Sequence, residues 1–78
     1  MTPEKLYRIG DVMRYSGISR QTIHNYTLLG LIREVERTSG GHRLYPEEVF
    51  ERLKVIQELK NTKTLKEIRL ILDRQEDQ

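Results

Sequence analysis

The chain has 78 residues, of which 36% are apolar and 33% are charged, and it contains no cysteine and no tryptophan. A chain of this length buries only about 60% of the surface that its unfolded form exposes, so we expect one domain over residues 1–78 with a small core; the lack of cysteine excludes disulfide scaffolds, thiolate metal sites and catalytic cysteines. The net charge is +2, with seven basic and four acidic residues over 1–43 but seven and eight over 44–78, which is consistent with a first half that faces a polyanion.

Two short helices joined by a tight turn are predicted for residues 6–30. Apolar residues at helical spacing mark the first helix, of about two turns, at Leu6, Ile9, Val12, Met13 and Ile18. The second helix shows the same spacing at Ile23, Tyr26 and Leu29. Gly17 suits the left-handed residue that ends a helix, Ser19 supplies the oxygen that caps the next one, and Gly30 ends the segment. This arrangement is typical of a helix-turn-helix unit.

A small β-hairpin is predicted between residues 31 and 45. Its turn is placed at Gly40 and Gly41, because glycine accepts the positive φ that both positions of a tight hairpin turn require. Pro46 follows the hairpin and suits the first turn of a further helix.

The longest predicted helix follows Pro46. Its apolar residues are Val49, Phe50, Leu53, Ile56 and Leu59, and it should end near residues 60–61. We expect Ile23, Leu53 and Ile56 to form the core between the second and third helices.

A last helix is predicted from residue 64 onward. Thr64 and Glu67 match the T-x-x-E capping box at its start. Its apolar residues are Leu65, Ile68, Leu70, Ile71 and Leu72. The polar tail from Arg74 to Gln78 is expected to fray.

The second predicted helix has one polar face. Residues four apart lie on the same side of a helix, so Arg20 projects together with His24. Gln21 projects together with Asn25 in the same way. An arginine suits guanine, the two amides suit adenine, and a histidine suits guanine or phosphate, so this face fits base edges in a major groove. A solvated helix face is the alternative, but the position as second helix after a tight turn favours DNA.

The hairpin offers further donors for phosphate groups. Arg37, His42 and Arg43 lie close to the two glycines, which let the backbone approach another surface. The alternative is an ordinary hairpin whose basic side chains are solvated and do not bind DNA. Tyr26 and Tyr45 are also candidates, because their hydroxyls could reach the DNA backbone while their rings pack against protein; burial with an internal partner is the equal alternative.

The sequence shows no pattern typical of a metal site, a cofactor site or an active site. His24 and His42 have no cysteine and no third histidine to complete a ligand set. No Ser/His/Asp set, phosphate-binding loop or dinucleotide fingerprint occurs, so we do not expect an enzyme. The chain has no run of about 20 apolar residues and no signal peptide, which predicts a soluble, cytoplasmic protein without a membrane partner.

Three segments, residues 9–32, 38–56 and 64–72, carry a family resemblance. Their most specific parts are the turn at residues 16–18, the T-I-x-x-Y run at residues 22–26 with the L-G-L-I that follows, and the G-G-H-R-L-Y sequence at residues 40–45. Together they resemble the DNA-binding domain of the MerR family of bacterial transcription regulators over about residues 7–73. The resemblance implies a mostly α, winged helix-turn-helix fold: a helix-turn-helix, a β-hairpin wing and two further helices. It also implies that the second helix enters a major groove and that the wing lies against the backbone.

The resemblance also bears on single positions and on assembly. Arg43 matches the family's wing arginine. His24 and Asn25 stand where the family commonly has arginine and tyrosine, and Phe50 stands where a smaller aliphatic residue is usual. The family continues into a long dimerisation helix and an effector-binding region. We expect neither in this chain, nor a small-molecule effector site, and the isolated chain should be a monomer that dimerises on DNA or through segments not present here.

The sequence therefore favours a bacterial transcription regulator that binds specific double-stranded DNA. One alternative is an excisionase-like architectural factor that binds direct repeats cooperatively, which footprinting on an arrayed site against an inverted repeat would separate. Another is a protein-interaction module that docks a partner through its last two helices, which recovery of a partner without any DNA shift would favour.

Overall fold

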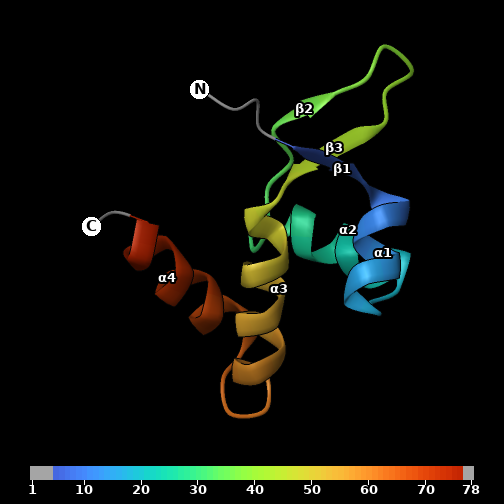
Figure 1. The fold of residues 1–78 in the computed structure, drawn as a ribbon. Coiled ribbons are helices and arrows are strands. Elements are labelled where there is room, and N and C mark those ends of the chain that lie inside the picture. The colour runs from blue at the N-terminus through green and yellow to red at the C-terminus, as the bar shows by residue number, and fades with distance from the viewer. Residues whose placement is uncertain (1–4, 77–78) are drawn as a thin grey trace.

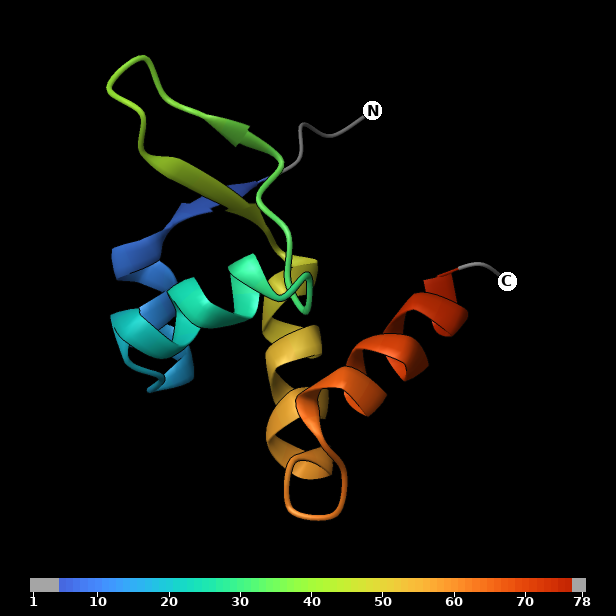
Figure 2. The same cartoon turned by 180° about the vertical axis from the view of Figure 1, so that it is seen from behind.

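The computed structural model describes residues 5–76, and within that range it contains four helices and one three-stranded antiparallel sheet (Figure 1). The elements in chain order are β1 (Leu6–Arg8), α1 (Ile9–Ser16), α2 (Arg20–Leu28), β2 (Glu36–Arg37), β3 (Arg43–Pro46), α3 (Glu48–Leu59) and α4 (Leu65–Glu76). Figures 1 and 2 show the sheet at one end of the molecule, with α1 and α4 on opposite sides of α3. The predicted winged helix-turn-helix class is confirmed.

The helix-turn-helix unit forms at the predicted positions. Gly17 ends α1 in the left-handed conformation, with φ of 73°, and its N–H donates to the carbonyl of Met13. Ser19 precedes α2, and its hydroxyl oxygen accepts the backbone N–H of Thr22 at 3.2 Å. Both caps satisfy backbone N–H or C=O groups that would otherwise lack a hydrogen-bond partner at a helix end. The turn between the helices therefore needs only three residues.

The strand β1 was not predicted. Leu6 had been assigned to the first helix, but residues 6–8 are extended and pair with β3, so that Leu6 lies opposite Pro46 and Arg8 opposite Leu44. The helix begins only at Ile9. A strand of three residues is too short to show an alternating pattern of its own, and its pairing partner lies far along the chain.

The wing differs from the predicted hairpin in its turn. The N–H of Thr38 donates to the carbonyl of His42 at 2.9 Å, and that of Gly41 donates to the carbonyl of Thr38 at 2.8 Å. The loop therefore has three residues, 39–41, and Gly41 has a positive φ of 83° whereas Gly40 does not. This is the common hairpin loop in which the last loop residue takes the left-handed conformation. The prediction that both glycines take positive φ was wrong.

The start of α3 also differs from the prediction. Pro46 is the last residue of β3 and is buried, and α3 begins at Glu48. A proline at the end of a strand costs nothing where no ladder hydrogen bond is needed from its nitrogen. The end of the helix at Leu59 agrees with the prediction.

The core is one cluster to which all four helices and β3 contribute. Ile23, Leu53 and Ile56, the residues predicted to form it, are at most 2% exposed. The other buried hydrophobic residues in the described part of the chain are Val12, Tyr26, Leu31, Ile32, Tyr45, Val49, Ile68 and Leu72. Because Ile23 and Tyr26 are buried, the opposite, polar face of α2 is directed to solvent.

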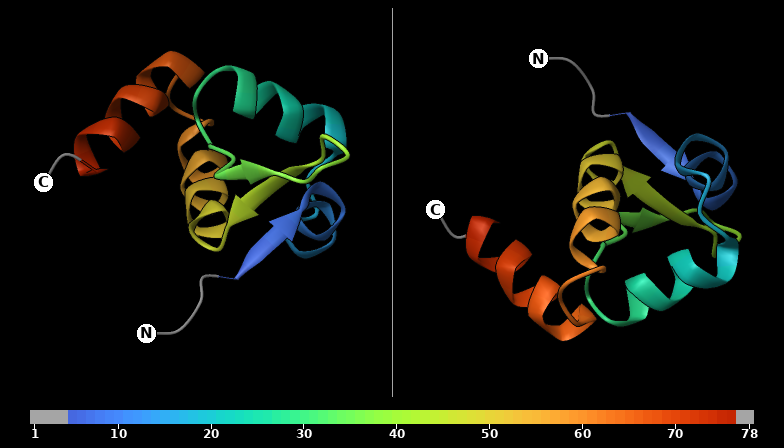
Figure 3. Two further views of the ribbon diagram at one scale, coloured as in Figure 1. Left: turned by 90° about the horizontal axis from the view of Figure 1, so that it is seen from above. Right: turned by 90° about the horizontal axis from the view of Figure 1, so that it is seen from below.

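The last helix packs against α3 through Ile68 and Leu72, on the side away from α1, as the views along α3 in Figure 3 show. It continues to Glu76, so the prediction of a frayed tail from Arg74 was wrong for residues 74–76; residues 77–78 lie outside the described range. No helix in the described part of the chain has the length and apolar character needed to cross a membrane.

Thr64 and Glu67 form the predicted capping box at the start of α4. The Glu67 carboxylate accepts the backbone N–H of Thr64 at 3.0 Å, and the Thr64 hydroxyl oxygen accepts the N–H of Glu67 at 3.1 Å. The hydrogen bond from the Thr64 backbone lowers the pKa of Glu67 below its ordinary value of 4.5. Because the pKa is lower in the folded state, this stabilisation is fully present above the ordinary value and is lost as the pH falls through the lowered one.

Replacing Glu67 with glutamine should remove this part of the pH dependence. The amide oxygen still accepts the Thr64 N–H but does not titrate, so the melting temperature of the wild type should converge on that of Glu67→Gln as the pH falls below about 4.5. Thr64→Ala removes only the hydroxyl that accepts the N–H of Glu67; it should cost about 0.5–2 kcal/mol of unfolding free energy but keep most of the pH dependence, because the backbone N–H of residue 64 still donates to the carboxylate. A difference between wild type and Glu67→Gln that stays constant from neutral to acid pH would contradict this account.

Candidate nucleic-acid interface

A groove of about 360 Å³ lies between the start of α2 and the wing. Its lining residues are Ile9, Arg20, Gln21, His24, Arg37, Gly41, His42 and Arg43. Six of the nine predicted site residues are among them, so the fold brings together side chains from two segments that are separate in the sequence. None of the eight described lining residues is acidic, and three are arginines. This composition suits a polyanion.

The side of the groove formed by α2 presents its polar face. Arg20, Gln21 and Asn25 are exposed. The Gln21 Nε2 donates to Asn25 Oδ1 at 3.1 Å, which leaves the outer donor and acceptor atoms of both amides available to a ligand. Asn25 does not line the groove itself but is held beside it by this hydrogen bond.

The wing side contributes three cationic or polar side chains with different surroundings. His42 is exposed, and Arg37 is 54% exposed while its Nε lies 2.9 Å from Glu34 Oε1. Arg43 is only 25% exposed; its Nε lies 2.7 Å from Glu34 Oε2 and its Nη1 lies 2.9 Å from His24 Nδ1. Arg43 therefore connects the wing to α2, and its predicted phosphate contact stays a prediction.

The two tyrosines lie in the core. Tyr26 is 5% exposed and Tyr45 is fully buried, and the Tyr45 hydroxyl lies 2.9 Å from Thr27 Oγ1. For Tyr45 the structure thus shows the internal partner that the sequence left open, and for Tyr26 it shows a buried side chain. Tyr45 contacts α2 from the core side, since Thr27 belongs to that helix.

One residue at this site escaped the sequence reasoning. Glu34 contacts both wing arginines, yet nothing in the sequence distinguishes it from Glu36 two positions later. Arg43 lies next to Glu34 only because β3 runs back alongside the segment that contains residue 34. Ile9 also lines the groove, although the sequence marked it only as part of the apolar pattern of the first helix.

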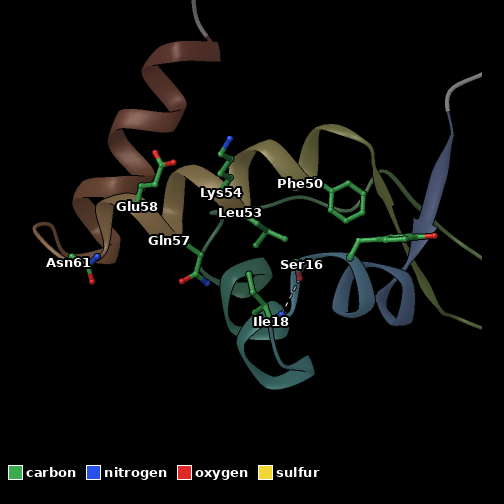
Figure 4. Close-up of a pocket in the computed structure, with 9 residues that line it drawn as sticks. Ser16, Ile18, Phe50, Leu53, Lys54, Gln57, Glu58 and Asn61 are labelled. Atoms are coloured by element: carbon green, nitrogen blue, oxygen red, sulfur yellow. Dashed lines mark hydrogen bonds between the residues drawn. The ribbon is translucent and has the colours of Figure 1, made fainter.

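A second, larger hollow of about 510 Å³ lies between the end of α1 and α3 (Figure 4). Its floor includes Phe50 and Leu53, and its charged lining residues are Lys54 and Glu58, of opposite sign. Because these charges offset one another, the hollow lacks the positive potential that attracts nucleic acid. Size alone therefore does not identify the interface.

The sequence of residues 7–75 matches the family model described as MerR HTH family regulatory protein. The chain belongs to the MerR family. A crystal structure of a MerR-family transcriptional regulator from Bacillus cereus has the same fold, with a TM-score of 0.76 and 26% sequence identity over 87% of this chain and 52% of that one.

Curated relatives are similar at the level of sequence. The chain is 39% identical to the mercuric resistance operon regulatory protein of Bacillus cereus over 67 residues, which are 85% of this chain and 51% of that protein. It is 38% identical to the nodulation protein NolA of Bradyrhizobium sp. (strain NC92), over 86% of this chain and 29% of NolA. The chain thus spans about half or less of the length of these relatives. Regulators of the MerR family are DNA-binding transcription regulators, which is a class of proteins that are not enzymes.

Proposed function

We propose that this MerR-family domain binds double-stranded DNA, with α2 in a major groove and the wing along the sugar-phosphate backbone. The observation that carries the proposal is the groove in which the polar face of α2 and the arginines of the wing meet without an acidic lining residue. A protein that binds DNA needs base-reading side chains and phosphate-binding cations on one surface, and this groove supplies both.

The two sides of the groove would have different roles, with α2 contacting bases and the wing contacting the DNA backbone. Gln21 and Asn25 offer amide groups that can bind adenine edges, and Arg20 suits guanine. The amides at the N-terminus of α2 favour a phosphate near that end of the helix. Arg37 and His42 would contact the backbone, which positions the domain but carries no base information.

The relatives favour this function over the two alternatives. The matched family model and the curated relatives are regulators, and none of the alternatives finds support in them. We further propose that one copy of this chain covers one half-site and acts in the cytoplasm, where bacterial DNA lies. The arrangement of operator half-sites and any response to a small molecule would depend on the whole regulator.

Salt-dependent binding tests the proposal. Titrating a labelled duplex with the chain by fluorescence anisotropy at several salt concentrations should give a straight line of log affinity against log salt, to which each phosphate contact contributes about 0.9 in slope. Arg37→Gln should weaken matched and scrambled duplexes alike and reduce the slope by about 0.9, because a phosphate contact is lost.

The matched control is Arg74→Gln, which removes the same charge from α4, outside the groove. It should leave the slope close to that of the wild type. Equal effects of the two substitutions would show that only net charge attracts DNA, and failure of the wild type to bind any duplex at low salt would overturn the proposed function.

A further inference from the structure

Glu34 is an acidic residue placed beside a groove that we expect to bind a polyanion. Its two carboxylate oxygens lie 2.9 Å from Arg37 Nε and 2.7 Å from Arg43 Nε, and its side chain is only 25% exposed. By Coulomb's law a carboxylate at this place repels phosphate, and it also neutralises arginines that could attract it. Its contribution to binding must therefore come from geometry.

The geometry that Glu34 controls reaches α2 through Arg43. The guanidinium of Arg43 is held by Glu34 at Nε and contacts His24 Nδ1 through Nη1 at 2.9 Å. A guanidinium has donors only and does not lose its proton in proteins. The Nδ1 atom must therefore accept the hydrogen bond, which requires a neutral ring whose proton is on Nε2.

We propose that Glu34 is a positioning residue of the DNA interface: through Arg43 it holds the His24 ring as the neutral Nε2–H form, so that α2 presents a hydrogen-bond donor to DNA. The inference rests on the proposed function. The group that His24 contacts must then be an acceptor, such as guanine N7 or O6, thymine O4 or a phosphate oxygen. His24 lines the groove, and the link joins α2 to the wing across 19 positions of sequence.

The first test uses the free protein and needs no DNA. Nitrogen-15 NMR of the histidine rings should show, at neutral pH, an unprotonated Nδ1 and a protonated Nε2 for His24. In Glu34→Gln the His24 signals should move towards those of a ring that exchanges between its two neutral forms. Glu36→Gln, which removes an equal charge from the neighbouring exposed position, should leave them unchanged. Unchanged His24 signals in Glu34→Gln would overturn the proposal.

The second test compares the same two variants in DNA binding. Both remove one negative charge, so electrostatics alone predicts that both bind DNA as tightly as the wild type or more tightly. We expect Glu36→Gln to do so, whereas Glu34→Gln should lose up to about tenfold in affinity for the matched site, which is the upper end of the loss expected from one hydrogen bond. In an Arg43→Ala background, Glu34→Gln should cause no further loss.

One further variant and the wild type complete the design. Glu34→Asp keeps the carboxylate and should recover part of the affinity, and thermal melts establish that each variant is folded at the assay temperature. If the wild type binds DNA but Glu34→Gln tightens binding as Glu36→Gln does, the role of Glu34 is refuted while the proposed function stands. If the wild type binds no duplex, the proposed function fails, and the role of Glu34 fails with it.

Discussion

Replacing Leu53 with alanine should lower the unfolding free energy by about 2–5 kcal/mol, because the residue is 2% exposed and its truncation leaves a cavity in the hydrophobic core. In a domain of this size each kcal/mol lowers the melting temperature by about 4–8 °C. The unfolding free energy of a small domain is about 5–15 kcal/mol in total, so the substitution removes a large part of that free energy. Circular dichroism melts measure the effect directly.

Leu70→Ala is the matched control for Leu53→Ala. Leu70 is also a leucine in a helix, but it is 56% exposed, so its truncation should change the unfolding free energy by no more than about 0.5 kcal/mol. DNA binding by Leu53→Ala should be lost in proportion to the unfolded fraction and return on cooling below its melting temperature. A melt of Leu53→Ala that coincides with that of Leu70→Ala would contradict the burial of residue 53.

Replacing Gln21 or Asn25 with alanine should relax the base preference at one or two positions of the site. Each good contact between an amide side chain and a base edge contributes about 1–3 kcal/mol of discrimination, which is about 5- to 150-fold in affinity. Because Gln21 donates to Asn25 at 3.1 Å, the two side chains orient each other, and the double variant should lose less than the sum of the single losses. Selection of bound duplexes from a random pool, followed by affinity measurements, gives both results.

Asn61→Ala is the control for these substitutions, since Asn61 is an exposed amide in the loop between α3 and α4, away from the groove. It should select the same site as the wild type. Binding of Gln21→Ala and Asn25→Ala to scrambled duplexes should persist, because phosphate contacts do not depend on sequence. If both variants select the wild-type site, α2 does not read bases through this face.

Three helix ends in the described part of this protein are determined by residues close together in the sequence. Gly17 ends α1, Ser19 caps α2, and Thr64 with Glu67 caps α4, each through hydrogen bonds that span at most four positions. Apolar residues at helical spacing likewise indicate which side of α2 and of α3 is buried. These features were predictable because the spacing and the caps act within one or two helical turns.

The pairing of the strands and the side-chain contacts within the interface were decided only by the tertiary structure. The strand β1 exists because Leu6 meets Pro46, and the internal role of Tyr45 depends on Thr27, 18 positions away. Residues 34 and 36 are both glutamates in sequence, but the return of β3 brings Arg43 to the first and not to the second. Such pairings depend on how distant segments pack, and a local pattern contains no record of that packing.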